Sequence, residues 1–329
     1  MLSMLFRGFR FNLSKFCQMR FNSLLFGFLP FSLSQAYLRG LGALYFLLKW
    51  QEKKLIHRAL TRVLEADLTA VELKVVIKET FQGIIDHYHE KLFIAYSRFK
   101  PLLRFLRRNI KFSGEESLQE ALAGGKGVLL VTGHFGAVEF LPAALALNGY
   151  PVSMICRFQT NRLRDSLMDR GSRVNIKLID ADEGNVFISA AKELKNGRIV
   201  ITECDEFDEW RESNQFVHFL GSRLKADRSL DILKKRSGAA VVTGLLTRAG
   251  RKRYTLNLTP IPDNGPGAAA GMGAQCLAVL EEAIQASPEQ WYQWKKFGQL
   301  INVGLGEEVD DARSEIGYLA PEIGVSVTG

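Results

Sequence analysis

The segment Gly127–Glu139, GVLLVTGHFGAVE, decides how the chain is interpreted. It opens with an apolar run, continues into a histidine flanked by Gly133 and Gly136, and places Glu139 five residues after His134. A short apolar run bounded by glycines is typical of a strand buried in a sheet. Glycine also allows backbone angles and close ligand approach that other residues forbid. The segment therefore predicts a buried strand, a turn that carries His134, and a helix that contains Glu139.

His134 and Glu139 form the first candidate pair for chemistry. Two residues five apart within one helix point about 140° apart, so a contact requires His134 in the turn and Glu139 on the helix. In that arrangement Glu139 accepts a hydrogen bond from one imidazole nitrogen, and the other nitrogen takes a proton from a substrate hydroxyl. The alternative is a histidine at a helix N-cap and a glutamate favoured by the helix dipole. The spacing alone leaves both interpretations open.

The chain after Gly114 alternates short apolar runs with helix-like segments. The expected strands are Gly127–Thr132, Val152–Cys156, Ile176–Ile179, Ile199–Thr202, Ala240–Leu245 and Tyr254–Leu258. The expected helices between them lie near Ala137–Leu147, Leu163–Ser172, Asn185–Leu194 and Leu224–Arg236, and further helices run through Ala286 and Phe297. This alternation predicts an α/β fold with a central mixed sheet and helices on both of its faces.

Composition divides the chain into four parts. Residues 1–50 form a basic, aromatic segment, residues 51–112 a helical region, residues 113–303 the α/β domain, and residues 304–329 a flexible acidic tail. Within the helical region, Ser97–Phe112 places apolar residues on one stripe and arginines and lysines on its flanks. These basic residues form either a solvated helix face or a surface for an anionic partner, such as membrane phosphates or an acidic carrier protein.

The first fifty residues carry basic side chains, many phenylalanines and no acidic residue. Basic residues attract anionic lipid head groups, and aromatic rings settle at the membrane interface. Phe21–Leu38 is uncharged and about as long as a bilayer core requires, but Gly27 and Pro30 interrupt it. We expect membrane attachment, either spanning the bilayer or lying in its interface. A cleaved secretory signal and a buried helical hairpin are the alternatives.

Metal and nucleic-acid partners are not expected. The four cysteines lie far apart without a CxxC pair, which argues against a zinc site and fits reduced thiols. The run DHYHE at Asp86–Glu90 resembles a metal cluster, but His87 and His89 point about 200° apart on a helix. The net charge of +8 is carried among Phe and Leu rather than in a recognised nucleic-acid module.

Five motifs in the same order resemble the H-x4-E group of glycerolipid acyltransferases, in particular the bacterial late (lauroyl or myristoyl) acyltransferases of lipid A. The first box, GHFGAVE, keeps Gly133, His134, Gly136 and Glu139 of a G-H-x-G-N-W-E pattern. The later matches are Arg157 with Arg170, Ile199–Asp205 (IVITECD), His218–Arg223 (HFLGSR) and Ser287–Trp294 (SPEQWYQW). Together they cover most of residues 20–300.

The resemblance implies transfer of a fatty acyl group from a thioester, on acyl carrier protein or coenzyme A, to a hydroxyl of a lipid A-type glycolipid. It implies that His134 is the general base, assisted by Glu139, and that the enzyme needs no cofactor beyond the donor substrate. Oxyanion or substrate-binding roles fall to Arg157, to backbone N–H groups around Gly136, and to Glu203, Asp205 and Arg223. The implied location is the cytoplasmic face of the bacterial inner membrane.

The chain departs from the family pattern at two places. Ala137 and Val138 replace the usual Asn-Trp, and Lys295–Phe297 stands where a His-Arg-Arg-like run is usual. The reaction type therefore follows more firmly than the acceptor, which could be a lysophospholipid, another glycolipid, an amino-acid lipid or a polyene lipid. A catalytically inactive lipid-binding homologue is a third reading. Trp291 and Trp294 either lie at the membrane interface or pack between helices.

Overall fold

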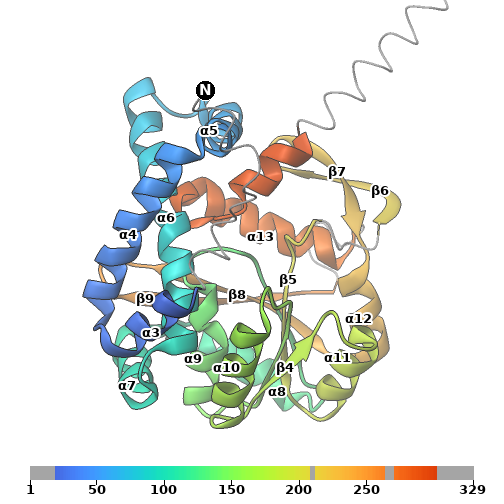
Figure 1. Ribbon diagram of the computed structural model, residues 1–329. Helices are drawn as coiled ribbons and strands as arrows, with labels where there is room; N and C mark the ends of the chain where they lie inside the picture. Colours follow the sequence, from blue (N-terminus) through green and yellow to red (C-terminus); the bar gives the residue numbers. More distant parts are fainter. Residues whose placement is uncertain (1–18, 208–211, 264–269, 302–329) are drawn as a thin grey trace, which may run out of the picture.

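The computed structural model in Figure 1 describes residues 19–207, 212–263 and 270–301. A helical layer comes first in the chain and an α/β sheet follows it. The helices of this layer are α3 (Arg20–Phe28), α4 (Phe31–Leu48), α5 (Trp50–Leu64), α6 (Ala70–Tyr96) and α7 (Phe99–Asn109). The longest of them, α6, begins with a capping box between Thr69 and Glu72, in which each side chain satisfies a backbone N–H of the other residue.

The central sheet is mixed, as the sequence predicts. Its strands are β1 (Ile110–Ser113), β2 (Val128–Thr132), β3 (Val152–Cys156), β4 (Ile176–Asp180), β5 (Ile199–Glu203), β8 (Ala240–Arg248) and β9 (Tyr254–Ile261), in the order β1-β9-β8-β2-β5-β3-β4. Strands β8, β2, β5, β3 and β4 are parallel, whereas β9 runs antiparallel to β8 and pairs with β1. A separate antiparallel ribbon is formed by β6 (Glu212–Phe219) and β7 (Ser222–Asp227).

Helices cover both faces of the sheet. The connections from β2 to β3 and from β3 to β4 cross the sheet in the same direction, which places α9 (Leu141–Leu147) and α10 (Asn161–Ser172) on one face. There α7 packs on α9 and α6 on α10. The return from β4 to β5 places α11 (Val186–Lys195) on the other face, beside α12 (Ser229–Ser237), which contacts α13 (Met272–Ala286). The remaining elements are α8 (Glu115–Ala123), the 3₁₀ turns η1 (Val138–Phe140) and η3 (Pro288–Gln290), and a helix over residues 294–301.

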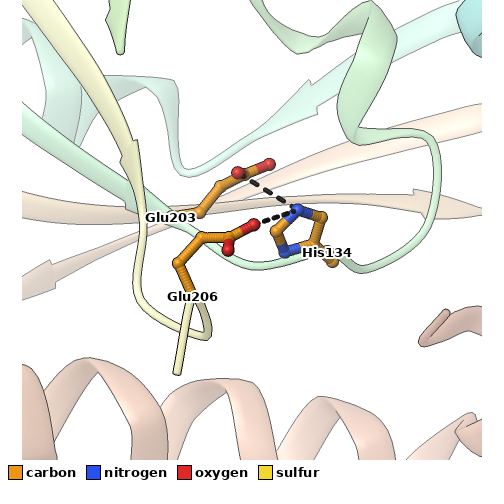
Figure 2. Close-up of side chains that lie close together, drawn as sticks. All are labelled: His134, Glu203 and Glu206. Atoms are coloured by element: carbon orange, nitrogen blue, oxygen red, sulfur yellow. Dashed lines mark ion pairs between the residues drawn. The ribbon is translucent and has the colours of Figure 1, made fainter. Parts of the chain in front are cut away.

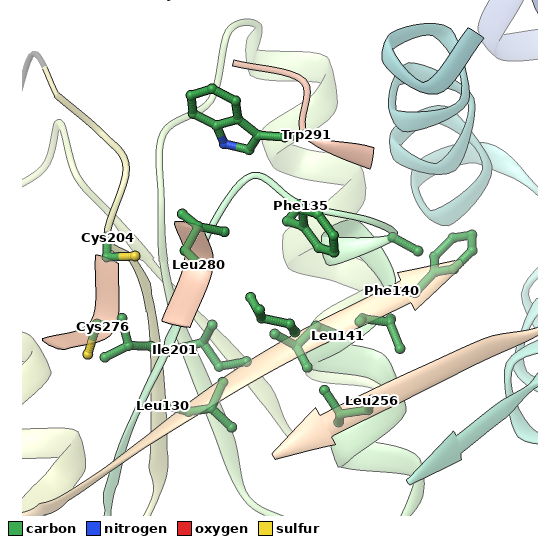
Figure 3. Packing of buried hydrophobic residues seen from close by; sticks show 14 of the residues in the cluster. Leu130, Phe135, Phe140, Leu141, Ile201, Cys204, Leu256, Cys276, Leu280 and Trp291 are labelled. Atoms are coloured by element: carbon green, nitrogen blue, oxygen red, sulfur yellow. The ribbon is translucent and has the colours of Figure 1, made fainter. Parts of the chain in front are cut away.

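Strand β2 lies at the centre of the core. All five of its residues are buried, because β5 and β8 flank it and helices cover both of its faces. Figure 3 shows side chains from β2, β5, β9 and α13 packed together beneath the turn that follows β2. This burial explains why the strand is a continuous apolar run rather than an alternating one.

All six expected strands are present, but two details of the prediction are wrong. The expected helix Leu224–Arg236 divides into strand β7, which ends at Asp227, and helix α12. The Asp227 carboxylate accepts the backbone N–H of Ser229, so the chain turns there before the helix begins. Strand β1, placed by composition in the helical region, pairs with β9 and extends the sheet.

The uncharged segment Phe21–Leu38 forms most of α3 and the first part of α4, which are separated at Pro30. Both helices pack on α6: the Phe26 ring of α3 lies 5.5 Å from the His89 ring between centres, and the Ser34 hydroxyl of α4 lies 2.8 Å from His89 Nε2. Across the ranges that the structure describes, no helix has both the length and the apolar character needed to cross a bilayer. The basic aromatic residues before Met19, and the acidic tail, lie outside the described residues.

Candidate active site

The candidate site lies at the carboxyl edge of the parallel strands. His134 follows β2, Arg157 follows β3, and Glu203 is the last residue of β5. The direction in which the chain crosses the sheet differs for the two central strands. After β2 the chain crosses towards β3 and β4 at one edge of the sheet, and after β5 it crosses towards β8 and β9 at the opposite edge. In open α/β sheets such a switch point leaves a crevice in which ligands bind.

Asp205 fixes the orientation of the His134 imidazole. Its carboxylate is fully buried and lies 2.8 Å from His134 Nδ1, and it also accepts the backbone N–H of His134 at 3.0 Å. The Trp291 indole N–H donates to the second oxygen of the same carboxylate at 2.8 Å. A carboxylate at Nδ1 keeps a proton on that nitrogen. The other nitrogen, Nε2, is therefore the one that can exchange a proton.

Two further carboxylates meet the exchangeable nitrogen. Figure 2 shows Glu203 and Glu206 both pointing at His134 Nε2, at 3.2 and 3.0 Å. Lys296 pairs with Glu206 through a contact of 2.9 Å between Nζ and Oε2. The site thus concentrates three carboxylates around one imidazole, with a lysine at its rim.

This arrangement shifts the proton equilibria of the site. Burial opposes charge on His134, but the charges of Glu203 and Asp205 and the hydrogen bonds to Asp205 and Glu206 hold the imidazole pKa well above its ordinary value. Burial raises the pKa of Glu203 to about 7 against the opposing charge of His134. Although burial also disfavours charge on Glu206, His134 and Lys296 lower its pKa to about 2. These shifts favour a protonated imidazole beside an ionised Glu206.

The turn that carries His134 is held by a clamp from the end of the chain. The Gly136 N–H donates to the Gln290 carbonyl, and the Tyr292 N–H donates to the His134 carbonyl. The Arg248 guanidinium donates to the Gly136 carbonyl at 2.7 Å and forms a paired contact with Glu90 at 2.8 and 2.9 Å. The Gly136 N–H, which was expected to serve an oxyanion, is thus already bonded to the Gln290 carbonyl, and the Ala137 N–H is bonded to the Leu246 carbonyl.

Glu139 does not take the partner expected from its spacing. Among the described residues, neither His134 nitrogen is paired with Glu139. Its carboxylate instead lies 2.9 Å from Lys91 Nζ and 3.3 Å from His87 Nε2, both on α6. The helix that was expected to present Glu139 to His134 begins as the 3₁₀ turn η1, which directs this carboxylate towards α6. Asp205 occupies the position that the sequence assigned to Glu139.

A cavity of about 630 Å³ opens above these groups. Its polar lining includes Lys91, His134, Glu139, Arg157, Glu203, Glu206, Tyr292 and Lys296. Its apolar lining comes from α6, α7, α9, α10, α11, α12 and the sheet, including Ile94, Leu103, Met154, Leu167, Phe187 and Leu233. Arg157 pairs with Asp182 at 2.8 Å. Arg223 does not line the cavity; its guanidinium carbon lies 3.7 Å from the centre of the Phe216 ring, on the β6–β7 ribbon.

The remaining sequence candidates have structural partners. Trp291 and Trp294 are fully buried, so the interface interpretation of these residues is wrong. His87 stacks on Tyr292, with ring centres 3.6 Å apart, whereas His89 faces Ser34. The two histidines therefore share no ligand site. Arg170 donates to the carbonyls of Ile94 and Ser97 at the end of α6.

One group in the described residues could hold a metal ion. Ligand atoms of His134, Glu203 and Glu206 lie within 4.8 Å of one another. A nitrogen and two carboxylate oxygens are donors that zinc accepts. The same geometry is that of an imidazolium ion between two carboxylates, and the raised imidazole pKa agrees with this second interpretation.

A buried histidine held among carboxylates, beside a cavity with many aliphatic side chains, is typical of enzymes that use acid–base chemistry. A family profile described as bacterial lipid A biosynthesis acyltransferase matches residues 20–296, and the chain belongs to this family. It is therefore an acyltransferase, and the family's reaction is acyl transfer to a lipid A-like acceptor. A comparison with curated proteins gives no match.

Proposed function

We propose that the enzyme moves a fatty acyl group from an acyl thioester to a hydroxyl of a lipid A-type glycolipid, with His134 as general base. The donor is acyl carrier protein or coenzyme A carrying the acyl chain, and no resident cofactor takes part. The observation that carries the mechanism is the Asp205 contact at His134 Nδ1, which leaves Nε2 as the nitrogen that exchanges protons on the cavity side.

The reaction requires one proton to move twice. His134 Nε2 takes the proton of the acceptor hydroxyl while the hydroxyl oxygen attacks the thioester carbonyl carbon. The tetrahedral intermediate then collapses, the carbon–sulfur bond breaks, and the departing sulfur receives the proton from Nε2. A positioned base of this kind contributes about 10²–10⁴-fold to the rate. Asp205 stabilises the imidazolium that forms between the two transfers, and no enzyme nucleophile is needed.

Glu203 and Glu206 prepare the base for this cycle. Both carboxylates lie at Nε2, where the acceptor hydroxyl must also bind. Glu206 is at the rim, with a side chain 31% exposed and a lysine partner that can hold it aside. Glu203 has a pKa of about 7 and can carry a proton at neutral pH. We infer that entry of the acceptor displaces Glu206 and that loss of its charge makes Nε2 more readily deprotonated.

The apolar lining supports a fatty acyl donor. Helices α7, α9 and α10 and strand β3 present aliphatic side chains to the cavity beside His134. Arg157 lines the same cavity and stays a candidate for binding an anionic group of either substrate. Ala137 and Val138 are buried and do not line the cavity, so these departures from the family pattern carry no direct information about the acceptor. Lys296 does line it, at a second departure from the pattern.

We propose that the face formed by α3, α4 and α7 lies on the cytoplasmic surface of the bacterial inner membrane. Apolar side chains on α3 and α4 point away from the protein and are more than half exposed: Phe21, Leu24, Phe28, Leu33, Leu44, Leu47 and Leu48. The guanidinium of Arg98 lies over the Phe28 ring, which connects this apolar surface to the exposed basic residues of α7. Exposed apolar residues beside basic ones are suited to an anionic lipid surface.

Mass spectrometry of the product tests the proposed function. The full chain is incubated with an acyl thioester and a lipid A-type acceptor that lacks one acyl chain, or with a lysophospholipid. We expect the mass of one acyl group to be added to the lipid A-type acceptor, and His134→Gln to abolish the addition. Acylation of the lysophospholipid alone would reassign the acceptor. Thioester cleavage without acylation of either lipid would contradict transfer to these acceptors.

Vesicle flotation tests the membrane face. The full chain should float with vesicles that contain phosphatidylglycerol, and Leu24→Ser with Phe28→Ser should reduce the floated fraction. Val75→Ser, which removes an exposed apolar side chain from α6, serves as the control. Equal flotation of the α3 variant and the unmodified chain would show that α3 does not contact the membrane.

A further inference from the structure

A second charged cluster lies in the wall of the cavity, apart from the three carboxylates around His134. It consists of Lys91, Glu139 and His87. Lys91 and Glu139 line the cavity, whereas His87 lies behind them and is almost completely buried. The acid–base steps described above use none of these residues.

The ammonium of Lys91 is kept charged inside the protein. Burial disfavours its charge, but the carboxylate of Glu139, 2.9 Å away, raises its pKa to about 12. An ammonium group has three N–H donors, and Glu139 is the hydrogen-bonding partner of Lys91 in the part of the chain that the structure describes. Lys91 therefore brings a fixed positive charge and further donor capacity to the cavity.

His87 contacts Glu139, the partner of Lys91, and carries no charge of its own. Burial lowers the pKa of His87 well below its ordinary value, and Lys91 and His134 lower it further, so the ring is neutral. Its Nε2 lies 3.3 Å from a Glu139 oxygen, and neither ring nitrogen forms a well-aligned hydrogen bond in the described structure. A neutral ring at this position adds no positive charge that would repel the ammonium.

A chain of direct contacts connects this cluster to the base. His87 stacks on Tyr292, with ring centres 3.6 Å apart, and the Tyr292 and His134 rings pack edge to face, with ring centres 4.7 Å apart. Glu139 joins His87 to Lys91. Lys91 and His134 line the same cavity, and the charge of Glu203, which lies 3.2 Å from His134 Nε2, also acts on Lys91. A cation and a base therefore face the space in which the thioester is proposed to bind.

We propose that Lys91 is the electrostatic catalyst that stabilises the oxyanion of the tetrahedral intermediate, and that Glu139 is the residue that positions it. Negative charge develops on the thioester carbonyl oxygen when the acceptor attacks, and a preorganised cation in a cavity stabilises this charge more than it stabilises the neutral substrate. The proposal rests on the proposed acyl transfer. It gives Glu139 a role in catalysis through Lys91 rather than through His134.

Steady-state kinetics of the full chain test this assignment. Lys91→Met should lower kcat by about 10²–10³-fold with little change in KM, because the charge is needed mainly in the transition state. Lys91→Arg should recover part of kcat. Glu139→Gln should lower kcat without moving the pH midpoint of kcat/KM, and the Lys91→Met/Glu139→Gln double variant should be no slower than Lys91→Met alone. Lys195→Met, at an exposed position on α11, is the control.

Each outcome has a distinct meaning once circular dichroism has shown that the variants are folded. A folded Lys91→Met enzyme with kcat within threefold of the unmodified enzyme would overturn the proposal, as would an effect on KM alone, which would assign Lys91 to substrate binding. A shift of the pH midpoint of kcat/KM in Glu139→Gln would indicate that Glu139 acts on His134 rather than on Lys91. Failure of the unmodified enzyme to transfer acyl groups would instead contradict the proposed function.

Discussion

Replacing Glu206 by glutamine should move the pH dependence of the reaction towards lower pH. Glu206 lies 3.0 Å from His134 Nε2 and stabilises the protonated imidazole, which is the inactive form of a general base. Removing its charge lowers the imidazole pKa, so the active form appears at lower pH. If the imidazolium were the active species, the midpoint would also move to lower pH, but activity would fall rather than rise as the pH increases through it.

The size of the shift in the His134 pKa follows from the distance between the Glu206 carboxylate and Nε2. Two unit charges 3.0 Å apart attract each other by about 1.4 kcal/mol in water and by about 2.8 kcal/mol at an effective dielectric constant of about 40. The Glu206 side chain is 31% exposed, which favours the lower end of this range. One pKa unit corresponds to about 1.4 kcal/mol, so the midpoint should fall by about 1–2 pH units.

The assay is kcat/KM measured across pH, because this ratio reports the ionisation of the free enzyme. The unmodified enzyme should gain activity as pH rises, with a midpoint above the ordinary range of histidine. Glu206→Gln should reach half its maximum at lower pH. Glu52→Gln, which removes a carboxylate paired with Lys295, is the matched control. An unchanged or higher midpoint for Glu206→Gln would refute the reasoning.

Three further predictions concern the support of the site. Arg248→Met leaves the buried Glu90 carboxylate unpaired and should lower the free energy of unfolding by about 3–5 kcal/mol, measured by urea denaturation; an unchanged midpoint and slope would contradict this. Gly136→Ala places a Cβ 2.1 Å from the Leu246 carbonyl oxygen at a positive φ, and should reduce thermal stability and activity more than Gly125→Ala, where φ is also positive but the space is open. Incubation with EDTA should leave the rate unchanged, whereas a loss restored by zinc would assign a metal to His134, Glu203 and Glu206.

The sequence predicted the framework of this fold because its signals are local. Each of the six expected strands is an apolar run that ends near a glycine or polar residue, and the structure contains all of them. Strand β1 was not expected, because its four residues, IKFS, are too few to show a period and become a strand by pairing with β9. The second part of β7, Leu224–Asp227, was predicted to be helical because its apolar residues also fit the stripe of the helix that follows.

Some of the residues gathered at the site were predicted, but Glu206 and the contacts between the residues were not. His134, Glu203 and Asp205 were all candidates, and the structure brings them together. Asp205 is 71 residues from His134 in sequence, so no local spacing could show that it, rather than Glu139, meets Nδ1. Lys91 had no sequence signal of its own, because its importance comes from the long-range contact between α6 and η1.

The most direct test of the account is a comparison of His134→Gln with Asp205→Asn in transfer of an acyl group to a lipid A-type acceptor, followed by mass spectrometry. We expect His134→Gln to show no transfer above background, and Asp205→Asn to retain a much reduced rate with a lower pH midpoint, because a neutral partner no longer stabilises the imidazolium. Transfer by folded His134→Gln at the rate of the unmodified enzyme would contradict the assignment of the base. A pH midpoint unaffected by Asp205→Asn would contradict the role of Asp205.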